Sequence, residues 1–216
     1  MTAILLFLLL LSLTGCGHEE PTGKDMPPAY LLSVTAGETN GSGILYQKDE
    51  NWLYVLTAAH VVSGIESDGQ AILRFCDGWE ISGSNISRSA TTDIALIRVP
   101  LDEIPDRREE SYQCVESDKD SFDRLRIGDA CTAVGLAGDG GELRHEGNIL
   151  NPWIYMEDYG QYMIWAEGRI QPGMSGGGLL DPEGRLTGIL SGGSEDGELA
   201  AVPLSLVLQF MLECTQ

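Results

Sequence analysis

From Tyr30 onward the chain is a succession of short apolar segments separated by Gly, Asn, Asp and Ser, and this pattern limits the folds available to it. No amphipathic helix separates the segments, and glycine is abundant, with 27 residues among 216. Closely spaced short strands of this kind favour an antiparallel barrel or sandwich. We expect strands over residues 30–35, 43–47, 52–57, 71–75, 79–82, 94–99, 130–135, 142–150, 161–170, 177–180, 186–190 and 199–203.

The composition also predicts where the chain divides. Between residues 101 and 124 it becomes charged and polar, with Pro105 inside, which indicates a linker between two β units. Residues 204–213 are apolar at helical spacing and predict a closing helix, and residues 58–63 predict a short helical turn. The predicted division is a signal peptide over 1–15, a tether over 16–28, a first barrel over 29–104, a linker over 105–125, and a second barrel with its helix over 126–216.

Residues 171–178, Gln-Pro-Gly-Met-Ser-Gly-Gly-Gly, are suited to hold a nucleophilic serine. Glycines on both sides of Ser175 permit a sharp turn that directs backbone N–H groups at a point beside the hydroxyl. A hydroxyl also needs a general base and a group that orients the base. The candidates are His60, which follows Thr-Ala-Ala at the end of an apolar run, and Asp93, which precedes Ile-Ala-Leu.

The order His60, Asp93, Ser175, with Thr-Ala-Ala-His, Asp-Ile-Ala-Leu and Gly-x-Ser-Gly-Gly around these residues, resembles the chymotrypsin/trypsin-like serine proteases over about residues 30–213. The Pro-Gly-x-Ser-Gly-Gly form is similar to the bacterial high-temperature-requirement branch. The resemblance implies an all-β fold of two six-stranded antiparallel Greek-key barrels with the site between them. It further implies that His60 is the general base, that Asp93 orients it, and that the N–H groups of Gly173 and Ser175 form the oxyanion hole.

The resemblance also implies how a substrate is bound. Residues 188–193 are similar to the strand that pairs with the substrate backbone, so Ser191, Gly192 and Gly193 are candidate binding residues, and Ser191 occupies the position of a serine that supports the triad aspartate. Arg169 lies where trypsins carry the aspartate at the base of the specificity pocket. A buried cation there would select an acidic side chain, whereas an outward-facing Arg169, or one paired with Glu167, would not.

Two further positions carry expectations. Met174 replaces the aspartate that, in trypsins, pairs with the new N-terminus after activation, so the nucleophile loop must be held in another way. His145 lies among charged residues without a family motif and is expected on the surface.

The first 15 residues have the apolar run of a targeting segment, too short to cross a bilayer comfortably. Leu-Thr-Gly-Cys over 13–16 resembles a bacterial lipoprotein cleavage box, which implies that Cys16 is lipidated and anchors the protein to a membrane of the cell envelope. No Lys or Arg precedes the apolar run, which departs from the usual pattern, and an ordinary secretory signal with an incidental Cys16 is the alternative. Both interpretations predict export.

Four further cysteines, in an exported chain, suggest two disulfides with three possible connectivities, of which we favour Cys114–Cys131 and Cys76–Cys214. No cysteine or histidine spacing suggests zinc, and we expect neither a metal nor a cofactor. The net charge of −20 disfavours nucleic-acid binding. The same charge either favours basic substrates or only keeps the protein soluble.

These observations predict an exported serine endopeptidase whose partners are protein or peptide substrates. The alternative is a catalytically silent protein of the same fold that binds or scaffolds in the cell envelope, although such a protein would not need all three triad side chains. An α/β-hydrolase esterase is excluded because that fold requires the order nucleophile, acid, histidine and alternating helices.

Overall fold

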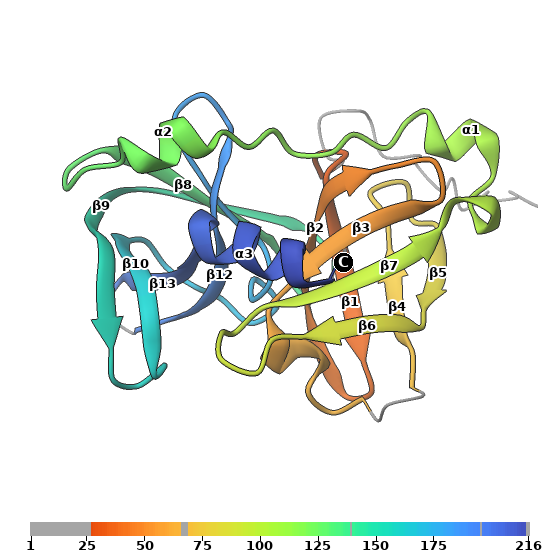
Figure 1. Ribbon diagram of the computed structural model, residues 1–216, viewed down its shortest axis with the longest axis horizontal. Coiled ribbons are helices and arrows are strands. Elements are labelled where there is room, and N and C mark those ends of the chain that lie inside the picture. Colours follow the sequence, from red (N-terminus) through yellow and green to blue (C-terminus); the bar gives the residue numbers. More distant parts are fainter. Residues whose placement is uncertain (1–26, 66–68, 139, 195, 215–216) are drawn as a thin grey trace, which may run out of the picture.

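The computed structural model describes residues 27–65, 69–138, 140–194 and 196–214, which form two antiparallel sheets side by side (Figure 1). The first sheet has seven strands in the order β5-β4-β1-β2-β3-β7-β6. Their bounds are β1 Leu31–Ala36, β2 Thr39–Lys48, β3 Trp52–Thr57, β4 Ala71–Arg74, β5 Glu80–Gly83, β6 Asn85–Arg88 and β7 Ala95–Pro100. A short 3₁₀ helix, η1 (Ala59–Val62), follows β3 and carries His60.

The second sheet closes into a six-stranded barrel in the order β10-β13-β12-β11-β8-β9. Its strands are β8 Ala130–Leu136, β9 Glu142–Met156, β10 Gln161–Glu167, β11 Gly178–Leu180, β12 Leu186–Gly193 and β13 Glu198–Pro203. The helix α3 (Leu204–Cys214) follows directly and lies near the middle of the molecule in Figure 1. Closure removes the free sheet edges and encloses the alternating apolar side chains of the strands.

The segment between the sheets, drawn in green across the top of Figure 1, contains three short helical turns that the composition did not predict. They are η2 (Leu101–Glu103), α1 (Asp106–Glu109) and α2 (Lys119–Asp123). The turn α2 begins where the side chain of Asp118 accepts a hydrogen bond from the backbone N–H of Asp120 (3.0 Å). Phe122 then packs into the hydrophobic core.

The all-β, two-barrel prediction is confirmed, and each of the twelve predicted strands has a counterpart. The largest differences are at β9, which ends at 156 and not at 150, and at β2, which begins at 39 and not at 43. The prediction of six strands in the first sheet is wrong, because β6 pairs with β7 at the sheet edge from Asn85↔Arg98 to Arg88↔Ala95. The sequence of β6, Asn-Ile-Ser-Arg, has a single apolar residue. An edge strand is held by its backbone hydrogen bonds to one neighbour, so it can form without the apolar pattern that we used to find strands.

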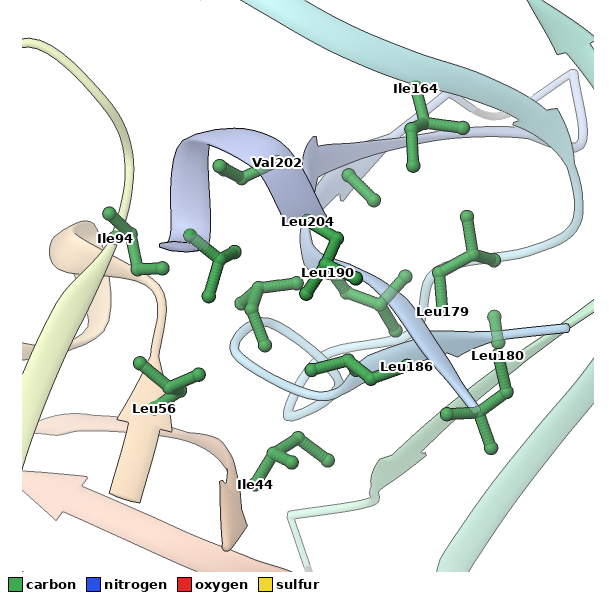
Figure 2. Packing of buried hydrophobic residues seen from close by; sticks show 14 of the residues in the cluster. Ile44, Leu56, Ile94, Ile164, Leu179, Leu180, Leu186, Leu190, Val202 and Leu204 are labelled. Atoms are coloured by element: carbon green, nitrogen blue, oxygen red, sulfur yellow. The ribbon is translucent and has the colours of Figure 1, made fainter. Parts of the chain in front are cut away.

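One hydrophobic cluster joins the two barrels. Ile44 and Leu56 from the first barrel are fully buried in the same cluster as Leu186 and Leu190 from the second, and Figure 2 shows these side chains pointing into a common space. Burial of each such side chain contributes about 1.5–3 kcal/mol. The cluster therefore holds His60 and Asp93, which belong to the first barrel, at a fixed place relative to the loop of Ser175.

The prediction of two disulfides is wrong. Cys76, Cys114, Cys131 and Cys214 are all free thiols. Burial raises the pKa of all four thiols, but the neighbouring side chains that act on each pKa differ. They are Asp77 for Cys76, Lys48 for Cys114, Glu167 for Cys131, and Ser87 and Arg98 for Cys214. Because sequence spacing does not report which side chains share a neighbourhood, the even number of cysteines was misleading.

In the described part of the chain no helix has the length and apolar character needed to cross a membrane. The predicted signal peptide, most of the tether and Cys16 lie outside the described residues.

Candidate active site

His60 and Asp93 are joined by two hydrogen bonds. His60 lies on η1, and Asp93 lies in the bend before β7. The His60 Nδ1 to Asp93 Oδ2 distance is 2.8 Å, and the backbone N–H of His60 donates to Asp93 Oδ1 at 2.9 Å. Since an ionised carboxylate can only accept, the proton of the neutral imidazole is on Nδ1. The Nε2 lone pair is therefore available to accept a proton.

The same contact changes the pKa values of both groups. The hydrogen bond to Asp93 raises the pKa of His60 above its ordinary value of 6.5, although partial burial opposes the shift. Burial alone would raise the pKa of Asp93, but the hydrogen bonds from His60 and Ser191 outweigh it and lower that pKa. The charged pair is thus favoured once His60 takes up a proton.

Ser191 connects Asp93 to Ser175, the candidate nucleophile. Its hydroxyl donates a short hydrogen bond to Asp93 Oδ2, and its carbonyl oxygen accepts one from Ser175 Oγ at 3.4 Å. The pairing of β12 with β13 changes register between Leu190 and Gly192, so Ser191 is the extra residue of a β-bulge. A bulge redirects a side chain, which explains why the Ser191 hydroxyl meets Asp93.

The nucleophile loop, residues 171–177, is a tight turn that depends on glycine. Gly173 and Gly176 have φ angles of 101° and 86°, in the region that favours glycine. The N–H of Met174 donates to the carbonyl of Gln171 at 3.0 Å, and the Met174 side chain is fully buried. Among the described residues, no group accepts a hydrogen bond from the N–H of Gly173 or of Ser175. Both N–H groups are thus available to a ligand at a half-exposed position.

Ser175 Oγ and His60 do not form a hydrogen bond within the described part of the chain, where the hydroxyl is instead directed to Ser191. In sites without substrate the contact between nucleophile and base is often long and shortens only on binding.

Gln161 is a site residue that the sequence analysis missed. It is buried at the start of β10, and its Oε1 accepts a hydrogen bond from the backbone N–H of Asp93 at 3.1 Å. Its amide nitrogen faces the sulfur of Met163 at 3.1 Å. The second barrel therefore holds Asp93 through Gln161 as well as through Ser191. A glutamine at a strand start carries no sequence signal for this role.

Of the four predicted substrate-binding residues, Ser191, Gly192 and Gly193 lie at one end of β12, and Arg169 follows β10. A Cβ atom at Gly192 would lie 2.4 Å from Tyr159 Oη, and one at Gly193 would lie 2.9 Å from Ile170 Cγ1. Neither glycine position can hold a side chain without displacing its neighbour. The side chain of Arg169 is exposed, and Glu167, its proposed partner, accepts a hydrogen bond from Asn148 at 2.7 Å.

His145 is closer to the site than its surroundings in the sequence suggested. Its Nε2 is 3.1 Å from Nε2 of Gln171, the residue that begins the nucleophile loop. Strand β9 places it there by pairing with β8, where His145 is opposite Ala133.

A cavity of about 210 Å³ adjoins this end of β12 and is lined by residues including Tyr159, Gly193 and Glu198. A larger cavity, of about 710 Å³, lies between α3 and strands β2 and β3, and its lining includes none of His60, Asp93 and Ser175. Nowhere in the described ranges do three or more His, Cys, Asp or Glu side chains gather in a way that suits a metal ion.

The fold and these residues define a class of protein. A family profile described as "Trypsin-like peptidase domain" matches residues 41–189, which include His60, Asp93 and Ser175. The chain therefore belongs to the trypsin-like peptidases.

The more similar relatives are HtrA-type serine proteases. The serine protease Do-like HtrA of Bacillus subtilis (strain 168) is 28% identical over 160 residues, which cover 70% of this chain and 33% of the relative. A probable periplasmic serine endoprotease, DegP-like, of Hahella chejuensis is 28% identical over 182 residues, covering 81% of this chain and 35% of the relative. The chain thus spans about a third of the length of these relatives.

Solved structures with a similar fold include an HtrA-type protease. The HtrA-type protease AlgW, solved with a tripeptide, superposes with a TM-score of 0.68 at 26% identity, covering 85% of this chain and 59% of AlgW. The Rv3671c protease superposes with a TM-score of 0.67 over 87% of this chain and 90% of its own, at 15% identity, and this likeness shows the fold alone.

Proposed function

We propose that this chain hydrolyses peptide bonds through an acyl-enzyme formed on Ser175. The observation that carries the proposal is the connected set of hydrogen bonds from the Ser175 hydroxyl through the carbonyl and hydroxyl of Ser191 and the carboxylate of Asp93 to His60. Beside it lie two N–H groups that lack a protein acceptor in the described residues. Family membership supports the same chemistry.

In this mechanism His60 Nε2 takes the proton of Ser175 Oγ as the oxygen attacks the substrate carbonyl. Asp93 holds the imidazole in the required tautomer and stabilises the imidazolium that forms. The N–H groups of Gly173 and Ser175 then stabilise the negative oxygen of the tetrahedral intermediate. Loss of one such donor typically raises the barrier by about 2.7–4 kcal/mol. His60 returns the proton to the leaving amine, and water releases the acyl group by the same steps.

The test is labelling of residues 27–216 with a fluorophosphonate probe. We expect the unmodified chain and a Ser111→Ala control, which removes an exposed serine outside the site, to be labelled. Ser175→Ala and His60→Ala should not be labelled, and Ser175→Ala should lower turnover about 10⁶-fold. If the folded unmodified chain takes up no label, the alternative of a silent binding or scaffold protein is the better description.

Arg169 is retained as a candidate specificity residue. Its exposed guanidinium would attract an acidic substrate side chain next to the cleaved bond, but an exposed ion pair contributes only about 0–1 kcal/mol. We therefore expect at most about a fivefold preference for acidic peptides. Equal cleavage of acidic and neutral peptides, or an unchanged preference in Arg169→Ala, would remove this assignment.

We also propose export and lipid anchoring at Cys16. The periplasmic description of relatives supports export, and the Leu-Thr-Gly-Cys sequence supports the anchor. Mass spectrometry of the mature protein should find a lipidated Cys16 at the N-terminus, and Cys16→Ala should release the protein from membranes. An unlipidated N-terminus at any other residue would contradict the anchor.

A further inference from the structure

Ser42, in the middle of β2, is fully buried and forms hydrogen bonds to both barrels. Its hydroxyl donates to the carbonyl of Gly173 at 2.7 Å and accepts from the N–H of Leu136 at 2.8 Å. Its backbone N–H donates to the carbonyl of Ser175 at 2.7 Å. Its own carbonyl accepts from Thr57 Oγ1 at 2.7 Å. A single side chain of the first barrel thus reaches both the nucleophile loop and β8.

The backbone of β2 and that of the nucleophile loop are also in direct contact. A Cβ atom at Gly41 would lie 2.8 Å from the carbonyl oxygen of Ser175, and one at Gly176 would lie 2.2 Å from the carbonyl oxygen of Ser42. Glycine is therefore needed at position 41 of the Gly-Ser-Gly sequence over 41–43, because the nucleophile loop approaches too closely for a side chain there. The side chains of Val61 and Thr57 also border this space, at 2.7 Å from a Cβ atom at Gly41 and 2.3 Å from one at Gly176.

The two carbonyls held by Ser42 belong to the peptide units 173–174 and 175–176. The unit that carries the Ser175 N–H lies between them, and the unit that carries the Gly173 N–H adjoins the first. Both N–H groups proposed for the oxyanion hole are consequently positioned by the same residue. Glycines at 173 and 176 leave the loop backbone free to adopt other angles, so an external anchor is needed to select one conformation.

In trypsins this loop is held by an ion pair of the aspartate that Met174 replaces here. The buried thioether of Met174 cannot form such a pair. We propose that Ser42 is a positioning residue that holds the oxyanion loop in its working conformation and so takes the place of that ion pair. The inference rests on the proposed peptidase function and adds to it the means by which the loop is held without that ion pair.

The test compares Ser42→Ala with Thr187→Val in the full chain. Thr187 is a matched control, because its buried hydroxyl also donates to a backbone carbonyl, that of Leu179 at 2.9 Å, but outside the nucleophile loop. After correction for the folded fraction, we expect Ser42→Ala to lower kcat about 10–100-fold, less than the full loss of an oxyanion donor, with KM within about threefold. Binding of a peptide boronate, which mimics the tetrahedral intermediate, should weaken in proportion to kcat/KM. Thr187→Val should keep kcat within about twofold of the unmodified chain.

Hydrogen exchange supplies a readout that does not depend on turnover. In Ser42→Ala the amides of residues 171–177 should exchange faster while those of β13 stay unchanged, and Thr187→Val should leave residues 171–177 unchanged. If Ser42→Ala does not fold, Ser42→Cys replaces it, since a thiol fills the space but is a weak hydrogen-bonding group. Ser42→Cys should then show the same changes in kcat and in exchange.

The proposal is overturned if the folded Ser42 variant keeps the kcat of Thr187→Val, or if exchange over residues 171–177 does not change. An inactive unmodified chain whose exchange still responds to Ser42→Ala would contradict the peptidase function while leaving the positioning role intact. If the unmodified chain is active but exchange over residues 171–177 does not respond to Ser42→Ala, the positioning role is contradicted and the peptidase function is not.

Discussion

Replacement of Asp93 by asparagine tests the electrostatics of the site directly. The asparagine would keep the size of the side chain but remove the charge, and its amide would compete as a donor with His60 Nδ1–H across a distance that is now 2.8 Å. The imidazole would then present N–H instead of a lone pair to Ser175. In the triad mechanism this exchange lowers kcat by about 10⁴, which corresponds to about 5.5 kcal/mol in the barrier.

The pH dependence of kcat/KM tests the direction of the electrostatic effect of Asp93 on His60, whatever the size of the loss in kcat. The proposed mechanism requires neutral His60, and Asp93 raises the pKa of His60 above 6.5. The kcat/KM of the unmodified chain should therefore increase with pH through an apparent pKa above 6.5. In Asp93→Asn the carboxylate is gone, but the burial that lowers the pKa of His60 remains. The increase of kcat/KM with pH, which is the acid limb of the profile, should therefore move to lower pH.

The His60–Asp93 pair should also make the free energy of unfolding depend on pH. Because the pKa of His60 is raised by folding, the stabilisation is fully present below pH 6.5 and is lost as the pH rises through the folded value. Asp93→Asn should therefore lower the free energy of unfolding more at about pH 5.5 than at about pH 9. The His60 side chain is 46% exposed, so we expect a difference of at most about 1 kcal/mol.

The assays are peptide hydrolysis across the pH range and urea unfolding at the two pH values. An acid limb of kcat/KM that stays in place in Asp93→Asn would refute the assignment of Asp93 as the partner of the general base. Equal destabilisation at both pH values would show that the side chain acts by packing and not by charge.

Three further outcomes follow from the packing. Gly176→Ala should lower the free energy of unfolding, measured in urea, by about 2–6 kcal/mol, because backbone strain at φ 86° adds to a clash of the new Cβ atom 2.2 Å from the carbonyl oxygen of Ser42. Gly37→Ala, at φ 61° with open space around it, should lower it by only about 1–3 kcal/mol. Equal losses in the two variants would contradict this account. Leu56→Ala should cost about 2–5 kcal/mol, since it leaves a cavity in the cluster that joins the barrels, and a loss below about 1 kcal/mol would show that the cluster contributes little. A reductant should leave Tm unchanged because the four described cysteines are free, whereas a disulfide would contribute about 3 kcal/mol and its reduction would lower Tm.

The sequence by itself determined the fold class and the order of the elements. Alternation and turn residues are local properties, so the strands over residues 52–57 and 130–136 could be located without knowledge of their partners. The motifs around His60, Asp93 and Ser175 are equally local, and they selected the three residues proposed as the triad. The structure joins His60 to Asp93 directly and Ser175 to Asp93 through Ser191. Two sequence-based predictions were wrong. Strand β6 was not predicted, because its polar sequence is held by pairing with β7, and the disulfides were predicted wrongly, because they depend on distances between remote cysteines.

Only the tertiary structure decided how the site is held together. Ser42 and Gln161 reach the proposed triad or its loop from strands that are remote in the chain, and Ser42 is 131 positions from Gly173, whose carbonyl its hydroxyl binds. Of the residues that hold the site together, the resemblance had indicated Ser191, which does bind Asp93. Hydrogen bonds of this kind depend on the direction of each side chain after two barrels have packed against each other, and a bulge at Ser191 can reverse that direction. Local sequence carries the identity of a catalytic group, whereas its orientation is a property of the packed barrels.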